Sequence, residues 1–253
     1  MLIVNADDLG RCAVATDRIM ACFAANRISA ASAMVFMQDS ERAAALAKAS
    51  GLDVGLHINF TENCTGPNIP QLLRREHERT RRFLGRSNYA LLLYNPFLRR
   101  AFREVFQAQA TEFQRLYGRP PLHIDGHQHM HLCTNILLDG ILPAGTKVRR
   151  NFSFGPGEKN FVNRCYRKIA DCRLRQRHHL TDYFFALSQH LQPSRFRRVV
   201  LAAKTAKVEL MTHPQVDDEY KFLLGEDFAD ALREVQLTGF ESADDLQHAE
   251  LLS

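Results

Sequence analysis

The 253-residue sequence contains no tryptophan, and its 6 cysteines are scattered without a Cys-x-x-Cys pair. That spacing excludes the usual zinc-finger and thioredoxin-like patterns and, in a chain of this length, favours free thiols over disulfides. No apolar run approaches the roughly 18 residues of a membrane-spanning helix. The N-terminal residues include Asp7 and Asp8, which does not match the basic-then-apolar pattern of a secretory signal. We therefore expect a soluble cytoplasmic protein with no membrane span.

Glycine (13) and proline (9) do not reach the excess that marks a disordered chain, and hydrophobic residues make up 45% of the sequence. This share is sufficient for one large core, and the length is typical of a single α/β barrel. The formal charge is +5, with an isoelectric point near 9.0. Such a charge suits an anionic substrate, nucleic acid or a membrane surface, so it selects none of them.

Apolar segments of strand length alternate with helical patterns along the chain. Buried strands are predicted at residues 2–4, 31–37 and 53–57, with helices at 11–26 and 41–49 between them. This alternation indicates a parallel sheet with right-handed crossovers, and hence an α/β fold. Later in the chain we predict strands at 121–125, 146–150, 183–186, 207–212 and 239–241, and helices at 102–116 and 228–237.

Two segments interrupt this rhythm, at about residues 61–98 and 151–198. The first is expected to be an irregular loop or lid, because it begins with a Gly- and Pro-containing stretch. We interpret its arginines, within 74–86, as a solvated helix face in preference to an anion site. No repeat or linker-like change in composition divides the chain. The sequence thus predicts one domain, residues 1–253, carrying these two insertions.

Titratable side chains follow several of the predicted strands. They are Asp7, Asp8, His57, Asp125, His127 and His213. Because the carboxyl ends of parallel strands meet on one face, we expect these side chains to converge. Two adjacent carboxylates repel each other, so a bound cation is expected beside Asp7 and Asp8. Taken alone, the pair also suits a strand end whose Asp caps the next helix.

The most specific local signal is the run His123-Ile-Asp-Gly-His-Gln-His-Met-His131. A lone histidine is more often a satisfied polar residue, but four around one aspartate indicate metal binding. One Asp and two His leave coordination positions for water and substrate, as in catalytic sites. His129 and His131 are then expected behind the ligands or at the start of a helix, and Asp125 is expected to orient a ligand imidazole.

Four motifs, in order, resemble those of the YdjC/ChbG-like carbohydrate deacetylases, the ChbG/HpnK family. They are Asn5-Ala-Asp-Asp-Leu-Gly10, Gly55-Leu-His57, Asp125-Gly-His-Gln-His-Met-His131 and Met211-Thr-His-Pro214. Leu9 stands where that family usually has Phe. The resemblance spans residues 2–214 but leaves 61–96 and 151–198 unmatched. It implies a distorted TIM-type parallel (β/α) barrel, related in architecture to the polysaccharide deacetylases.

The resemblance also implies an activity: removal of an N-acetyl group from an acetylated amino sugar, with release of acetate. One divalent metal ion would be held by Asp8, His57 and His127, with Asp7 as general base and His213 as candidate general acid. These roles agree with general chemistry. A metal ion polarises a carbonyl and lowers the pKa of water, and a neighbouring carboxylate can accept the water's proton.

Three further residues are expected beside the substrate or behind the ligands: Asn5, Arg149 and Arg150. Either arginine could keep Asp7 ionised or stabilise an oxyanion, and structural pairing is an equal alternative. The metal is not identified, because an Asp-His-His set accepts zinc, magnesium, manganese or cobalt.

Two other functions stay open. The first is a different metal hydrolase such as a phosphoesterase, although two-metal phosphoesterases need bridging carboxylates beyond the single ligand set seen here. The second is a glycan- or nucleic-acid-binding protein that uses the basic segments 74–86 and 164–198. No RNP-like pattern supports a nucleic-acid partner, so none is expected. We expect the arginines to suit an anionic sugar instead, and a homodimer is one option for the assembly.

Overall fold

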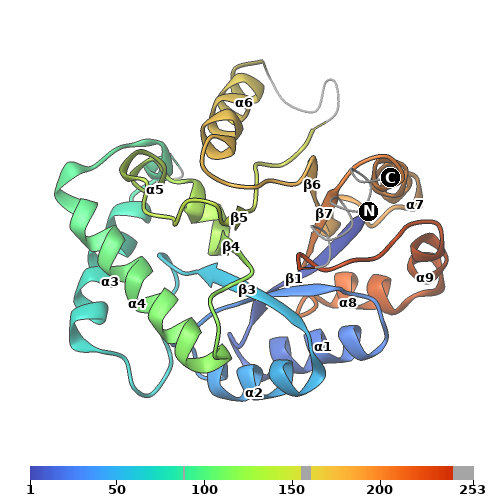
Figure 1. Cartoon of the computed structure of the whole chain (residues 1–253), viewed down its shortest axis with the longest axis horizontal. Helices are drawn as coiled ribbons and strands as arrows, with labels where there is room; N and C mark the ends of the chain where they lie inside the picture. The colour runs from blue at the N-terminus through green and yellow to red at the C-terminus, as the bar shows by residue number, and fades with distance from the viewer. Residues whose placement is uncertain (88, 155–160, 242–253) are drawn as a thin grey trace.

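A single parallel sheet organises the chain. The computed structural model describes residues 1–87, 89–154 and 161–241. The predicted domain is therefore not described at 88 and 155–160, which fall in the two predicted insertions, or at 242–253. Seven strands pair in the order β5-β4-β3-β2-β1-β7-β6, every pair parallel. They form a half-barrel with helices arranged around it (Figure 1). The predicted barrel-like α/β class is confirmed.

The strands are β1 (Leu2–Leu9), β2 (Ala30–Ala33), β3 (Asp53–Ile58), β4 (His123–Gly126), β5 (Lys147–Val148), β6 (Tyr183–Ala186) and β7 (Val208–Thr212). The α-helices are α1 (Ala13–Ala24), α2 (Ser40–Ser50), α3 (Gln71–Leu84), α4 (Arg99–Tyr117), α5 (Thr134–Asp139), α6 (Phe161–Arg175), α7 (Pro193–Ala203), α8 (Asp217–Leu224) and α9 (Glu226–Arg233). Short 3-10 turns lie at η1 (Ala90–Leu92), η2 (Pro96–Leu98), η3 (His127–Leu132) and η4 (Leu187–Gln189).

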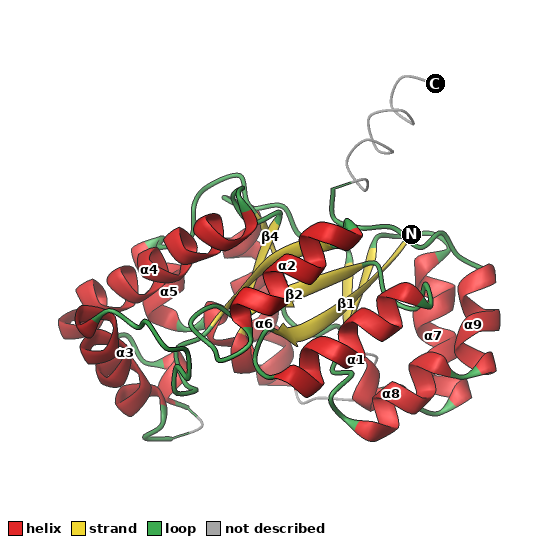
Figure 2. Cartoon of the chain, turned by 90° about the horizontal axis from the view of Figure 1, so that it is seen from below, coloured by secondary structure: helices red, strands yellow, loops and turns green. Residues whose placement is uncertain are grey.

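The two faces of the sheet have different chemistry. Outward residues such as Val4 and Leu56 belong to the main apolar core, under the helices that lie across the strands in Figure 2. Inward residues such as Asn5 and His57 are buried but polar. Side chains alternate between the faces of a strand, so each strand supplies both layers. The barrel interior is therefore polar toward the carboxyl ends of the strands.

An apolar floor closes the amino end of this interior. Ile3, Ala30 and Phe240 form a buried cluster, and the Phe240 ring stacks on that of His123 with centroids 3.8 Å apart. Residues 239–241 were expected to form a strand, and that prediction is wrong. Pairing with β1 is limited to one bridge, between Leu2 and Leu237, after which the chain turns under the strand ends.

Three other predicted boundaries need correction. The second strand ends at Ala33 instead of residue 37, because Phe36 has φ of 60° and its carbonyl accepts a hydrogen bond from Gly66. In the first predicted insertion, at 61–98, the irregular stretch ends at residue 70, where helix α3 follows. The first strand reaches Leu9, well beyond residue 4.

All the arginines of 74–86 except Arg86 lie on α3, where Arg81 and Arg82 both bind Glu78 within the helix. The predicted solvated helix face is confirmed, and α3 packs beside α4 (Figure 1). The second insertion contributes strand β6 to the edge of the sheet, and helix α6 and the start of α7 to the helices around it. Among the helices described, none combines the length and apolarity required to cross a membrane.

Candidate active site

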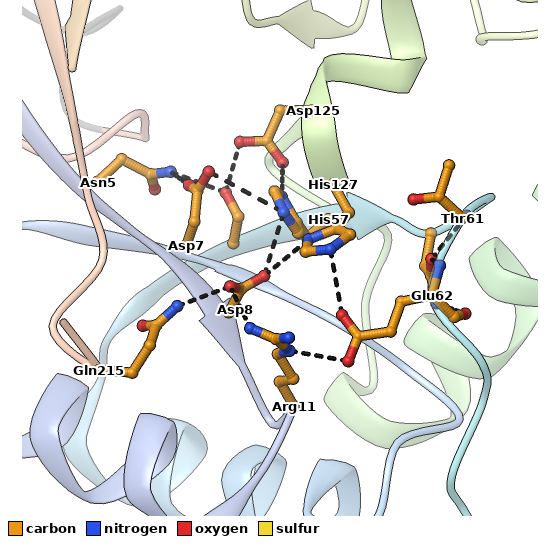
Figure 3. A network of polar contacts seen from close by, with 12 residues as sticks. Asn5, Asp7, Asp8, Arg11, His57, Thr61, Glu62, Asp125, His127 and Gln215 are labelled. Carbon is orange, nitrogen blue, oxygen red and sulfur yellow. Dashed lines mark hydrogen bonds and ion pairs between the residues drawn. The ribbon is translucent and has the colours of Figure 1, made fainter. Parts of the chain in front are cut away.

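Three potential metal ligands converge at the carboxyl ends of the strands. Asp8 lies near the end of β1, His57 near the end of β3, and His127 begins η3 directly after β4 (Figure 3). One ligand atom from each residue lies within 4.8 Å of the others. Asp8 Oδ1 is 3.5 Å from His57 Nε2 and 3.1 Å from His127 Nδ1. The convergence expected from the strand ends is thus present in the fold.

A bulge in β1 explains how two adjacent aspartates can face one site. Successive side chains of a regular strand point to opposite faces. Here the register with β2 shifts between Ala6 and Leu9, and Asp8 has φ of 72°. A non-glycine residue in this region is strained, and bulges of this kind re-aim side chains. Both Asp7 and Asp8 consequently approach Nε2 of His57, at 4.0 and 3.5 Å.

Strained backbone also follows His127, because the next two residues, Gln128 and His129, have φ of 52° and 60°. Such outliers cost about 1–3 kcal/mol each and persist where the surrounding structure fixes them. Their position beside a ligand candidate at the end of β4 matches the strain at the end of β1.

His57 is held from behind by Asp125. Its Nδ1 lies 2.8 Å from Asp125 Oδ1, which leaves Nε2 facing the two aspartates of β1. Burial lowers the pKa of His57, but the charges of Asp125 and Asp7 outweigh it and raise the value to about 9. The hydrogen bond between Asp125 and Nδ1 is the usual means by which a carboxylate behind a metal-binding imidazole fixes its tautomer.

The Ser32 hydroxyl connects the parts of this supporting layer. It donates to Asp125 Oδ2 at 2.8 Å, since a carboxylate can only accept. Its lone pairs then accept from Asn5 Nδ2 at 2.8 Å and from His123 Nε2 at 3.0 Å. The proton count places hydrogen on Nε2 of His123, in agreement with burial, which lowers the pKa of that imidazole to about 4.

Gly55 provides the space for His123. A Cβ added at Gly55 would lie 2.5 Å from three atoms of the His123 ring, far inside van der Waals contact. The glycine of the Gly-Leu-His motif therefore leaves room inside the barrel, two residues before His57.

The Arg149 guanidinium sits at the centre of the buried acids. It donates to both oxygens of Asp7 at 2.7 Å and to Glu209 at 2.6 Å, and it contacts Asp125 at 2.6 Å. Asp7, His57 and Asp125 form a second potential ligand group, but both of its carboxylates already bind this guanidinium. Of the two potential ligand groups among the described residues, the one that contains Asp8 is therefore the better candidate for a cation site.

The surroundings shift two carboxyl groups in opposite directions. Burial raises the pKa of Glu209, and although Arg149 lowers it, Asp125 repels the charge, so the value is about 7. Burial also raises the pKa of Asp8, but the hydrogen bond with His127 and the charge of His57 outweigh it. The pKa of Asp8 consequently lies well below its usual range, as suits a metal ligand.

Asp7 retains one free acceptor position. Its Oδ1 accepts from Asn5 at 3.0 Å and from Arg149, which fills that oxygen, whereas Oδ2 accepts from no described residue other than Arg149. A carboxylate oxygen has about two lone-pair sites, so Oδ2 can accept one more hydrogen bond. That oxygen is the one 4.0 Å from His57 Nε2, next to the ligand group.

His213 and Gln215 follow β7 on the same face. Gln215 Nε2 donates to Asp8 Oδ2 at 2.7 Å. The Nδ1 atom of His213 is 3.8 Å from Glu219 Oε1, and Glu219 also accepts from the His213 backbone at 2.7 Å. Burial lowers the pKa of His213, but Glu219 and Asp7 outweigh it and raise the value.

The remaining predicted residues lie farther from the ligand group. His131 Nε2 is 3.0 Å from the Arg149 carbonyl, and His129 packs its ring against Phe152, with centroids 4.6 Å apart. Arg150 binds Asp171 at 2.7 Å. Of the two predicted arginines, only Arg149 contacts Asp7.

Several residues of the site carry no recognisable motif: Arg11, Ser32, Glu62, Glu209 and Gln215. The signal that could have found Glu209 is an acid inside the apolar run of β7. Glu62 and Gln215 lie outside helices and strands, where sequence pattern gives no register.

The donor set suits a divalent metal ion. His57 Nε2 and Asp8 Oδ1 face each other at 3.5 Å, beyond the usual length of a hydrogen bond, and His127 Nδ1 lies 3.1 Å from the same Asp8 oxygen, so a shared ion could bind among these three atoms. Two imidazoles and a carboxylate are common ligands of first-row divalent metals.

Comparison with known proteins gives consistent results. The family model described as "YdjC-like protein" matches residues 1–246. A human carbohydrate deacetylase is 31% identical over 244 residues, which cover 84% of this chain and 74% of that protein. A mouse carbohydrate deacetylase is 36% identical over 141 residues, 53% of this chain and 44% of that protein. A chitooligosaccharide deacetylase of Serratia marcescens is 34% identical over 133 residues, 52% of this chain and 51% of that protein.

The chain thus spans about half the length of the mouse and Serratia marcescens relatives. Among solved structures, an Enterococcus faecalis V583 protein provisionally named a cellobiose-phosphate cleavage protein has a TM-score of 0.67. It is 16% identical, with 96% of this chain and 98% of that chain covered, and supports the fold alone.

Proposed function

This chain belongs to the YdjC-like protein family, and on that premise we propose that it is a metal-dependent carbohydrate deacetylase. The substrate is an acetylated amino sugar, whose amide C–N bond is cleaved to give acetate and a free amine. The observation that carries this proposal is the convergence of Asp8, His57 and His127 beside Asp7. The names of the human and Serratia marcescens relatives support the substrate class.

We propose that Asp8, His57 and His127 hold one divalent ion. When bound there, such an ion polarises the amide carbonyl and makes an attacking water more acidic. Zinc is the first choice and magnesium the alternative, because magnesium prefers all-oxygen coordination whereas two of these ligands are imidazoles.

Asp7 is the proposed general base. Its Oδ2 has a free acceptor position beside the ligand group, and Arg149 and Asn5 hold the carboxylate in place. This oxygen takes one proton from the water as the new C–O bond forms.

His213 is the proposed general acid, and it donates a proton to the departing amine nitrogen. The carboxylate of Glu219 favours the protonated ring, and 29% of the His213 side chain is exposed, so a substrate can reach it.

Four expectations from the sequence remain proposals. An anionic group on the sugar is supported by the formal charge of +5. A cytoplasmic location is supported by free thiols at Cys12, Cys22, Cys64, Cys133 and Cys172. A homodimer is supported by exposed apolar side chains such as Phe97, and a single domain is supported by the single sheet of the described residues. Equal turnover of neutral and charged acetylated sugars would contradict the proposal of an anionic sugar.

The test is acetate release over a panel of N-acetylated sugars, with and without a chelator. Asp8→Ala should lose both activity and metal affinity. Asp7→Asn should keep the metal affinity but lower kcat by about 10²–10⁴-fold, the range for removal of a general base. Asp217→Asn, on the surface, is the matched control and should change neither. If Asp7→Asn retains full activity, Asp7 is not the base.

A further inference from the structure

We propose that Glu62 is a positioning residue that holds His127 in the orientation needed to bind the metal. The inference rests on the proposed metal centre and adds a residue from the segment that follows β3. Glu62 Oε2 lies 3.1 Å from His127 Nε2 (Figure 3).

The two ligand histidines use opposite ring nitrogens. His57 is held through Nδ1 by Asp125 and presents Nε2 to the centre. His127 instead presents Nδ1, 3.1 Å from Asp8 Oδ1, and turns Nε2 toward Glu62. An imidazole that gives one nitrogen to a metal carries its proton on the other, and a carboxylate that accepts this proton fixes the ring. Glu62 thus occupies, for His127, the place that Asp125 occupies for His57.

The position of Glu62 is itself fixed by buried groups. Its backbone N–H donates to Asn59 Oδ1 at 2.8 Å, and Asn59 Nδ2 donates to the Glu62 carbonyl at 2.7 Å. Asn59 is in turn bound to Gln109 of α4, which accepts from its N–H at 2.7 Å and donates to its carbonyl at 2.8 Å. Asn59 and Gln109 are both buried. The turn that carries Glu62 is therefore anchored to the core.

The side chain of Glu62 is also oriented. Arg11 Nε donates to Glu62 Oε1 at 2.9 Å, which leaves Oε2 for His127. The same guanidinium donates to Asp8 Oδ2 at 3.4 Å, so Arg11 links Glu62 to the proposed metal ligand Asp8. A surface ion pair without a function would not require this division of the two carboxylate oxygens between two partners.

His127 needs an external support more than His57 does. The side chain of His57 is 2% exposed, whereas that of His127 is 13% exposed. The residues that follow His127 have strained backbone, so the rest of η3 does not fix the ring by regular helical packing. Among the described residues, the polar contacts of the His127 ring are with Asp8 and Glu62.

The test measures metal affinity directly, by titration of metal-free protein with Zn²⁺ against a competing chelator. Glu62→Gln and Glu62→Ala should weaken the affinity by about 10–100-fold, the range for loss of an outer carboxylate. Glu78→Gln is the matched control, because Glu78 is similarly exposed and also binds arginine, but only within α3. It should bind Zn²⁺ as the wild type does.

A double-mutant cycle shows whether Glu62 acts through His127. In a His127→Ala background, Glu62→Ala should cause no further loss of affinity, because the residue that it positions is already gone. If Glu62→Ala weakens the affinity as much in the His127→Ala background as in the wild-type chain, Glu62 acts independently of His127 and the inference is overturned. Wild-type affinity in the Glu62→Ala single variant would also overturn it.

Failure of the proposed function gives a different pattern. A wild-type chain that binds no Zn²⁺ would overturn the metal centre and this inference together. A chain that binds Zn²⁺ with the expected variant pattern, but releases no acetate from any sugar, would refute only the deacetylase activity.

Discussion

Arg149 offers the strongest test of how the buried charges are balanced. Its guanidinium is buried and binds Asp7, Asp125 and Glu209. Replacement by methionine retains much of the side-chain volume but leaves these carboxylates without their cation. Removal of one partner from a buried ion pair costs about 3–5 kcal/mol. Because three acids share this arginine, we expect Arg149→Met to lose stability at the upper end of that range.

The loss should depend on pH. In the wild type, Arg149 and His57 outweigh burial and hold the pKa of Asp125 below its usual range, so its contribution to stability is lost only as pH falls through that low value. Without Arg149, burial should raise this pKa above that of the unfolded chain. A carboxyl group shifted upward stabilises the fold at low pH, and its contribution is lost as pH rises through the folded-state pKa. The cost of Arg149→Met should therefore be larger at pH 8 than at pH 5.

The assay is urea unfolding followed by circular dichroism at both pH values. EDTA is included, because a bound metal stabilises the fold by mass action. Arg150→Met is the matched control: Arg150 binds Asp171 and its side chain is 18% exposed, so it should cost less. A loss below about 1 kcal/mol for Arg149→Met, or a larger loss for Arg150→Met, would refute the reasoning.

Three other predictions follow from the same interior. Glu209→Gln should make stability less dependent on pH between about 5 and 8, because the wild-type carboxyl, with a pKa raised to about 7, loses its stabilising contribution as pH rises through that value. If plots of the free energy of unfolding against pH are parallel for wild type and variant, this prediction is wrong. Gly55→Ala should cost about 1–3 kcal/mol in thermal unfolding, because the added methyl overlaps the His123 ring; an unchanged Tm would show that the ring can move. Saturating Zn²⁺, at 100 times its Kd, should stabilise the metal-free wild type by about 2.7 kcal/mol, and Asp8→Ala should show no such rise.

Much of the fold could be predicted because most strands have a continuous apolar run. The predicted strands at 183–186 and 207–212 closely match β6 and β7. The end of β1 was misplaced for a physical reason. Polar residues within 5–8 resemble a strand end, but they continue the strand because the barrel interior beside them is itself polar.

The candidate site could be predicted only in part. Asp8, His57 and His127 stand at strand ends, where topology alone brings them together. Ser32 and Glu62 were missed because their roles depend on the depth of a side chain within the barrel and on the path of a turn. Neither quantity has a periodic signal in the sequence.

The interior explains why so many of these residues are mutually dependent. The floor, made by Ile3, Ala30 and Phe240, supports the ring of His123. His123 shares the hydroxyl of Ser32 with Asp125, and Asp125 fixes the tautomer of a proposed ligand above it.

The interior can thus be described as layers that run from the amino end of the strands to their carboxyl end: the apolar floor, then His123 with Ser32 and Asp125, then the proposed ligands. Each layer orients polar atoms in the next. Neutral hydrogen bonds contribute only about 1 kcal/mol each in net stability, but a buried polar group left without its partner costs about 1–3 kcal/mol. The layers are therefore held in place chiefly by the cost of breaking them. This cost keeps Asp8, His57 and Asp7 close together even though two of them are like-charged neighbours in the chain.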